Sequence, residues 1–281
     1  MLQYFIDNKY NSIFANSIMP RLEYICVVDE SSSKMPRSMH LHEDTVEILL
    51  VAEGTGLYII EENKFTAKKG DLIFYNSKVL HDEYGGLGSG LATYCLGISN
   101  LHLKNMEKNK IISDKSYPVI SSGKYFDEFL TLLKVIQDNI QKTNMNEFCN
   151  SLAQALIIKS CDIIKHHSIS KPTMEHSLTV KIKAYIDNHY KENISLEKIA
   201  QAVKANRYYL AHTFKETTGF SPLQYVIRRR IGEAQNLLIH TDMSITQIAS
   251  SVGYNNSNYF QNVFRQNVGL TPGTYRQKWK F

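Results

Sequence analysis

The pattern of apolar and polar positions repeats itself in the last third of the chain. The segment 195–203 (SLEKIAQAV) matches 244–252 (SITQIASSV) at an offset of 49 residues, with serine, isoleucine, alanine and valine in register. After a turn that is one residue longer in the second copy, 209–225 matches 259–275 at an offset of 50 residues. Apolar residues in both copies recur at three- and four-residue steps, which is typical of helices. Self-similarity on this scale indicates one supersecondary unit that is used twice.

Each copy is predicted to form a helix, a tight turn and a second helix. Ser195 and Ser244 are suited to cap the first helices, and Gly219 and Gly269 to end the second ones. The second helices are expected over two ranges, 206–217 and 257–267. A helix-turn-helix places its second helix in the major groove of DNA.

The segment 222–240 lies between the two units, and its pattern predicts one continuous helix. At 1.5 Å per residue such a helix spans roughly 27 Å. It could therefore hold two second helices about one DNA turn apart, roughly 34 Å, on one face of a duplex. The alternative is a helical repeat that packs only against itself.

The distribution of charge favours the DNA-binding interpretation. The whole chain carries a net charge of +5. Residues 179–281 hold 14 lysines and arginines against 6 acidic residues, which gives +8, whereas residues 1–178 carry −3. Positive charge concentrated in the repeated segment is expected of a surface that binds phosphate.

Residues 1–123 show a different pattern, with short runs rich in branched and aromatic residues. These runs lie at 22–28, 46–52, 56–60 and 72–75, and glycine, asparagine, aspartate and serine separate them. Many short strands at close spacing predict a β-barrel or a sandwich.

Residues 124–167 return to three- and four-residue steps, which predict two amphipathic helices. The polar stretch 168–177 is expected to be a linker, and 178–281 to be the DNA-binding domain. The first helix of that domain is expected to bury Val180, Ile182, Ile186 and Tyr190. The predicted fold class is α+β, with two domains. An N-terminal barrel followed by two helices precedes an all-α domain, in which a long helix joins two helix-turn-helix units.

Six motifs follow one another in the repeated segment. They are Ser-Leu-x-x-Ile-Ala from 195, Tyr-Leu-x-x-x-Phe-Lys from 209, Thr-Gly-Phe-Ser-Pro from 218, Arg-x-x-x-Ala-x-x-Leu-Leu from 230, Ile-Ala-x-x-Val-Gly-Tyr from 248 and Tyr-Phe-x-x-x-Phe-Arg from 259. In this order they resemble the AraC/XylS transcription regulators. The resemblance implies a sequence-specific DNA-binding activator that responds to a small effector. It also implies a homodimer formed through 124–167, and contact with RNA polymerase.

The resemblance assigns roles within the two second helices. The positions expected to face the bases are Arg207, Tyr208, Ala211, His212, Ser257, Asn258, Gln261 and Asn262. Asparagine and glutamine can bond adenine edges, so the second unit is expected to favour A·T contacts. Phosphate contacts are expected from Lys215, Arg228, Arg229 and Arg265. Tyr209 and Tyr259 are expected in the core, together with Leu210, Phe214, Phe260 and Phe264.

The N-terminal region carries a second resemblance, to cupin barrels. His40-x-His42, Glu47 and Gly54 match the first cupin motif, and Gly70 followed by His81 matches the second. Four positions depart from the motifs: Lys34, Asn76, Lys78 and Gly85. In metal-using cupins the matching positions His40, His42, Glu47 and His81 would bind a divalent ion such as zinc, iron or manganese.

Two interpretations of this cluster stay open. In the first, it lines a pocket for a small effector together with Tyr58 and Tyr94, and no metal or cofactor is bound. In the second, it holds a metal, and the protein is a cupin enzyme fused to a DNA-binding module. We expect the first, and therefore a regulator rather than an enzyme. An architectural DNA-binding protein without an effector is a third class.

The apolar runs and the cysteines of the chain indicate the cellular compartment in which the protein is expected. There is no run of 18 apolar residues, and the first residues show neither a basic leader nor a long apolar core, so no membrane span and no signal peptide are expected. Four widely spaced cysteines without a Cys-x-x-Cys pair fit reduced thiols. The expected location is the cytoplasm, and the expected partners are double-stranded DNA, a small effector and a second copy of the chain.

Overall fold

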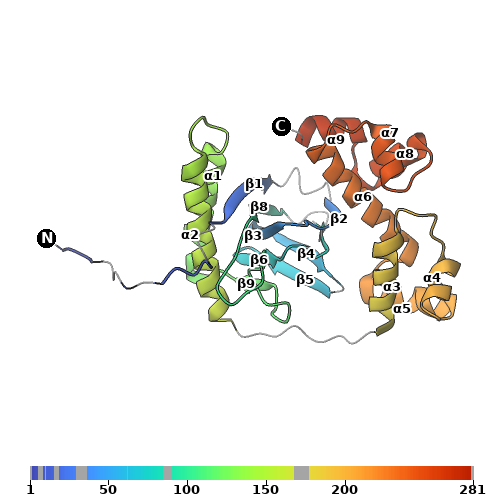
Figure 1. Cartoon of the computed structure of the whole chain (residues 1–281), viewed down its shortest axis with the longest axis horizontal. Coiled ribbons are helices and arrows are strands. Elements are labelled where there is room, and N and C mark those ends of the chain that lie inside the picture. The colour runs from blue at the N-terminus through green and yellow to red at the C-terminus, as the bar shows by residue number, and fades with distance from the viewer. Residues whose placement is uncertain are drawn as a thin grey trace.

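The computed structural model describes residues 2–5, 9, 11–15, 19–29, 37–61, 63–84, 90–167 and 177–279. Within them the chain forms a β domain, a pair of helices and an α-helical domain, as Figure 1 shows. Of the expected linker over 168–177, all but Ser177, which begins a helix, lies outside the described residues, as do Lys34 and Gly85.

Two antiparallel sheets form the β domain. The first has the strand order β1-β8-β3-β6-β9, and the second has the order β2-β7-β4-β5. The strands are β1 (Arg21–Val28), β2 (Arg37–His40), β3 (Thr45–Glu53), β4 (Thr55–Ile60), β5 (Asn63–Lys68), β6 (Asp71–Tyr75), β7 (His81–Tyr84), β8 (Ala92–Ser99) and β9 (Val119–Ser121). The four runs predicted from the sequence correspond to β1, β3, β4 and β6.

Alternation along the strands separates two apolar cores. Leu49 of β3 and Ile73 of β6 point between the sheets, where they pack with residues of β4, β5 and β8. Their neighbours Ile48 and Leu72 point the other way, into a second cluster with the helices that follow the barrel. The five-stranded sheet is therefore buried on both faces, which explains why β3 and β6 read as nearly continuous apolar runs.

Two amphipathic helices cover the outer face of this sheet, as predicted. A short 3-10 helix (Gly123–Tyr125) leads into α1 (Phe126–Asn139), and α2 (Asn146–Lys165) returns antiparallel to it. α1 buries Phe129, Leu133 and Ile136, and α2 buries Cys149, Ala153, Leu156, Ile157, Ser160 and Ile163.

The helical domain contains the doubled unit. Its helices are α3 (Ser177–His189), α4 (Leu196–Ala202), α5 (Arg207–Thr218), α6 (Pro222–His240), α7 (Ile245–Ser251), α8 (Ser257–Val268) and α9 (Pro272–Trp279). α4 and α5 form the first helix-turn-helix, and α7 and α8 form the second. The predicted spacer is α6, which runs between the two units in Figure 1.

Local chemistry sets where these helices begin and end. Ser221 and Ser244 each accept a bond from the backbone amide of a glutamine three residues on, whose side chain bonds back, so both form capping boxes. Gly219 and Gly269 follow α5 and α8 with φ of 84°, a conformation that glycine adopts without steric cost.

The predicted burial of Val180 is wrong, because its side chain is 47% exposed. The buried stripe of α3 begins one residue earlier, at Thr179, and continues through Ile182 and Ile186 to Tyr190, which directly follows the helix. These positions recur every three or four residues, so Val180 falls beside the stripe rather than in it.

The helical domain rests on the outer face of the four-stranded sheet. Met39 of β2, Ile59 of β4 and Leu80 pack into the same cluster as Ile182 of α3 and Phe214 of α5. The molecule is thus layered as helices, sheet, sheet and helical domain (Figure 1). In the described part of the chain, no helix combines the length and the apolar character needed to cross a bilayer.

Candidate functional site

The second helix of the first unit, α5, presents a polar surface. The side chain of Asn206 caps it by accepting bonds from the amides of Tyr208 (2.9 Å) and Tyr209 (3.4 Å). Arg207 and Tyr208 are exposed, and Arg207 donates to the Tyr208 hydroxyl at 2.8 Å and lies 3.1 Å from a Glu197 carboxylate oxygen. His212 is also exposed, and Ala211 is half-buried beside it. The predicted reading positions of α5 therefore lie on its accessible side.

The second unit repeats this arrangement on α8. Asn256 caps the helix by accepting bonds from the amides of Asn258 (2.9 Å) and Tyr259 (3.0 Å). Asn258 and Asn262 are exposed, whereas Ser257 and Gln261 are half-buried. Three of these four side chains are amides, so this accessible surface is rich in groups that can both donate to and accept from base edges.

Two tyrosines that were predicted in the core lie on this surface instead. Tyr209 is 62% exposed and Tyr259 is 57% exposed, whereas the neighbouring Leu210 and Phe260 are fully buried. One helical step rotates a side chain by about 100°, which carries these tyrosines off the buried stripe. The recurrence of tyrosine at the same place in both units was the available signal for a shared outward role.

The four basic residues predicted to contact phosphate divide into two groups. Lys215 and Arg265 are exposed in the last turns of α5 and α8. Arg228 and Arg229 of α6 are buried, so their prediction is wrong. Arg228 donates to Asp82 of β7 through Nε at 2.9 Å and also through Nη2, and Arg229 donates to Asp187 at 3.3 Å. A buried guanidinium needs such a carboxylate partner, and both arginines are engaged within the protein.

The barrel brings the cupin-like residues together. The imidazole and carboxylate ligand atoms of His40, His42, Glu47 and His81 all lie within 4.8 Å of one another. The Nε2 atom of His81 lies 2.9 Å from one carboxylate oxygen of Glu47, and that of His42 lies 3.5 Å from the other. The structure adds Tyr24 of β1, whose hydroxyl donates to Glu47 at 2.6 Å.

Backbone contacts fix the orientation of two of the imidazoles. The Nδ1 atom of His40 lies 3.0 Å from the carbonyl oxygen of Ser38, and that of His81 lies 3.0 Å from the carbonyl oxygen of Val79. A proton on Nδ1 satisfies these carbonyls and leaves Nε2 as the atom that faces the cluster. This is the arrangement found around metal-binding histidines, so the donor set fits a divalent ion.

Burial and charge act against each other in the cluster. Burial alone would raise the pKa of Glu47, but the positive charge of His42 and the hydrogen bonds of His42 and His81 hold it well below its usual range. Burial alone would lower the pKa of His81, but the hydrogen bond to Glu47 and its negative charge raise it. The protein thus favours a carboxylate beside a protonated imidazole.

The two tyrosines predicted for the pocket lie on different faces. Tyr58 is buried between the sheets, on the same side as the cluster, and burial raises the pKa of its phenol. Tyr94 packs on the outer face of the five-stranded sheet, under α1 and α2. It neighbours the inward-facing Cys95, so alternation turns it away from the pocket. Tyr75, which the sequence also offers as an aromatic wall of the pocket, lies beside the cluster, and its ring stacks on that of His81 with the ring centroids 4.1 Å apart.

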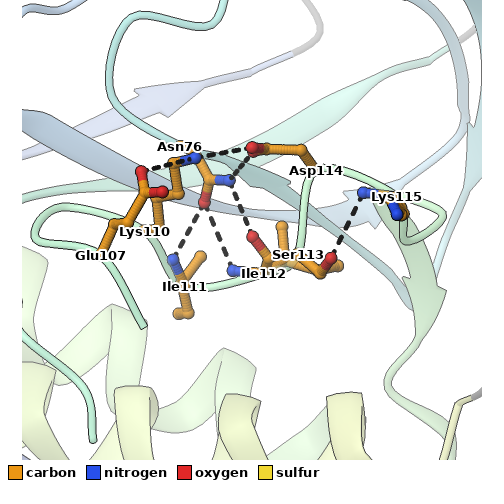
Figure 2. A network of polar contacts seen from close by, with 8 residues as sticks. All are labelled: Asn76, Glu107, Lys110, Ile111, Ile112, Ser113, Asp114 and Lys115. Carbon is orange, nitrogen blue, oxygen red and sulfur yellow. Dashed lines mark hydrogen bonds and ion pairs between the residues drawn. The ribbon is translucent and has the colours of Figure 1, made fainter. Parts of the chain in front are cut away.

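The departure from the cupin motif at Asn76 has a structural role. Its buried side-chain oxygen accepts bonds from the amides of Ile111 (2.9 Å) and Ile112 (3.3 Å), and its nitrogen donates to the Ile112 carbonyl at 2.8 Å and to Asp114 at 3.2 Å. Figure 2 shows this amide at the centre of the network that ties the 107–115 segment to the end of β6. Asparagine here fastens a loop to the barrel, which a proline could not do.

Both domains of the chain match known protein families. Residues 199–278 match the family described as a helix-turn-helix domain, and residues 27–84 match the cupin domain family. The uncharacterized HTH-type transcriptional regulator YdiP of Escherichia coli (strain K12) is 26% identical over 100% of this chain and 93% of its own length. The HTH-type transcriptional activator RhaS of Salmonella paratyphi A is 24% identical over 84% of this chain and 86% of its own. Among solved structures, the DNA-binding domain of AdpA in complex with a target DNA is 28% identical, with a TM-score of 0.35, over 36% of this chain and 91% of that chain.

Proposed function

We propose that the chain is a helix-turn-helix transcription regulator of the AraC/XylS type with an N-terminal cupin domain, and that it is an effector-responsive activator that binds DNA as a homodimer. The observation that carries the DNA-binding part is the pair of capped helices α5 and α8, each with exposed polar side chains. The charge of +8 on residues 179–281 adds attraction for phosphate. We assign 1–123 to effector sensing, 124–167 to dimerisation, 168–177 to the linker and 178–281 to DNA binding.

The proposed readers are the exposed and half-buried side chains of the two helices. They are Arg207, Tyr208, Ala211, His212, Ser257, Asn258, Gln261 and Asn262, with Lys215 and Arg265 on phosphates. We add Tyr209 and Tyr259, because they are exposed in the first turn of each helix, beside the predicted readers. Side chains near the start of a recognition helix are the ones that reach base edges.

Selection of bound duplexes from a random DNA pool tests the DNA-binding part. The full-length protein is expected to enrich a common site, with A·T pairs in the part that α8 contacts. Repeating the selection with cell-extract metabolites tests the effector part, because an effector is expected to change affinity for that same site. A pool that stays random after repeated rounds would contradict sequence-specific binding.

We propose that the barrel cluster senses an effector rather than catalysing a reaction. The residues offered to an effector are His40, His42, Glu47 and His81, with Tyr58 and Tyr75 as neighbours inside the barrel. Burial raises the pKa of both phenols, so they stay protonated and can donate. Donors beside a carboxylate suit a small polar molecule that presents both oxygen acceptors and hydroxyl or amine donors.

A metal is compatible with the same residues. His40, His42, Glu47 and His81 would hold it, and a bound divalent ion would supply positive charge that orients an effector's oxygen atoms. This four-donor cluster also favours a second candidate function, a metal-dependent cupin enzyme attached to a DNA-binding module.

Metal analysis of protein purified without chelator separates these candidates. A stoichiometric ion that is lost in His42→Ala would support metal binding, and turnover of a substrate that is lost with it would support the enzyme. If the full-length protein binds its DNA site without any metal, the result would support the metal-free effector sensor.

The dimer part of the proposal is supported by an apolar stripe on α2. Phe148 is 43% exposed and Ile158 is 48% exposed, and Leu152 and Ala155 lie half-buried between them. These residues follow three- and four-residue steps along one side of α2, where Phe148 and Ile158 are exposed and Leu152 also packs against the core. A second copy could bury this face and bring two pairs of reading helices to two half-sites. Activation through RNA polymerase in the cytoplasm completes the proposal, in keeping with a relative that is named an activator.

A further inference from the structure

The four-stranded sheet is where the two domains meet. Its inner side faces the barrel core, and its outer side is covered by the helical domain. Strand β2 packs along α6 and also touches α8, and Figure 1 shows α6 passing close to β2. One sheet therefore has the proposed effector site on one face and the DNA-binding domain on the other.

On each of two strands, a residue of the cluster is directly followed or preceded by a residue that contacts the helical domain. On β2, His40 belongs to the cluster, whereas Met39 is 1% exposed in the core of the first helix-turn-helix unit. On β7, His81 belongs to the cluster, whereas Asp82 accepts from Arg228 of α6. Successive side chains point to opposite faces of a strand, so a shift of β2 or β7 at the cluster also shifts the contacts behind it.

The contacts on α6 share one face. Arg228, Gly232 and Gln235 are spaced by four and three residues, which aligns them along the helix. Gln235 accepts from the amide of Ser38 at 2.9 Å, and a Cβ added to Gly232 would overlap the carbonyl oxygen of Met39. Glycine inside a helix costs about 1 kcal/mol relative to alanine, so this position favours close contact with β2 over helix stability.

The sheet contacts both reading units. On the first, Lys64 of β5 lies against Gly219 at the end of α5, and Lys183 of α3, the helix that packs beside this unit, donates to the carbonyl of Glu61. On the second, β2 touches α8. Since α6 joins the units and the sheet contacts each of them, the docked sheet restrains the position of α5 relative to α8.

We propose that the face of α6 formed by Arg228, Gly232 and Gln235 is the contact through which the state of the barrel cluster reaches the two DNA-reading helices. This rests on the proposed function of an effector-responsive regulator, and it names the route of regulation. A change at the cluster moves β2 and β7, alters their docking on α6 and so changes the relative placement of α5 and α8.

Hydrogen exchange of the full-length protein tests the docking step. Gly232→Ala is expected to raise amide exchange in β2 and along α6 by about tenfold or more, while β3 and β8 keep their protection. The matched control is Gly273→Ala, which adds the same methyl to α9 where nothing lies within 4 Å. Unchanged exchange in β2 and α6 of Gly232→Ala would overturn the proposal. If that variant does not fold, Gln235→Ala replaces it, with a smaller rise expected.

The coupling step is tested by combining this variant with a change in the cluster. Glu47→Gln is expected to alter exchange along α6 in the wild-type background and to have no further effect there in Gly232→Ala. The same effect in both backgrounds, or none in either, would overturn the route. If Glu47→Gln does not fold, His42→Gln serves instead, because its side chain is 12% exposed. Neither experiment uses DNA or effector, so their outcome is separate from that of the DNA selection.

Discussion

Single side chains of α5 and α8 are expected to determine which bases the protein prefers. Asn258 is exposed in the first turn of α8, and an asparagine can bond adenine at two atoms. We expect Asn258→Ala to lose preference at one base pair and to cost about 1–3 kcal/mol at that position. Competition binding across single-base variants of the selected site measures this. Gln266→Ala is the control, since it removes an exposed amide from the far end of the same helix. Base preferences identical to those of the wild type would remove Asn258 from the readout.

Lys215 is expected to act on phosphate rather than on bases. Lys215→Ala should therefore weaken binding to all sequences alike, and the slope of log affinity against log salt should fall by about 1. Titrations at several salt concentrations, on the selected site and on unrelated DNA, measure both effects. Lys165→Ala removes the same charge from the end of α2 and should change neither quantity. Discrimination between sites that changes in Lys215→Ala would argue for base contact instead.

The residue-level errors of sequence reasoning have two physical causes. Tyr209 and Tyr259 adjoin core positions, and an aromatic side chain next to a buried stripe gives no sign of which way it points. Arg228 was expected on phosphate because its segment is basic, but its partner Asp82 lies 146 residues away. Charge patterns along a chain do not reveal a partner in another domain.

At the scale of single helices, the surface of α2 leads to a prediction about dimerisation. α2 exposes an apolar stripe from Phe148 to Ile158, and burying such a face against a second copy would supply the free energy of pairing. We expect Phe148→Glu with Ile158→Glu to convert dimers into monomers, as seen by sedimentation. Val180→Glu is the matched control, because Val180 is 47% exposed on α3. An unchanged mass for the double variant would move the dimer interface elsewhere.

The helices were easier to predict than the strands. Asn206 and Asn256 cap the starts of α5 and α8, Gly219 and Gly269 end them, and Ser221 caps α6, so these limits follow from local chemistry. β2 and β7 have four residues each and were not singled out. Each is held by the other and by residues far along the chain, including Gln235 and Arg228. Strands this short carry too few positions for alternation to show.

At the scale of the whole molecule, no sequence motif predicted that the helical domain docks on the β domain. Nothing in the sequence around Met39, Ile59 and Leu80 marks them as interdomain contacts, but they pack into the core of the helical domain. The four cupin-like residues that the motif spacing singled out do come together, from β2, the residues after it, β3 and β7. The motifs did not indicate that the Tyr24 hydroxyl donates to Glu47, or that the helical domain packs behind the cluster.

The most direct test of the central claim is whether α5 and α8 read one duplex. Base preferences of His212→Ala and Asn262→Ala are compared with those of the wild type across every single-base variant of one selected site. We predict that each variant loses preference in its own block, and that the two blocks lie about one helical turn apart, roughly 10 bp. The claim would be contradicted if both variants lost preference at the same base pairs, or if one of them kept the base preferences of the wild type.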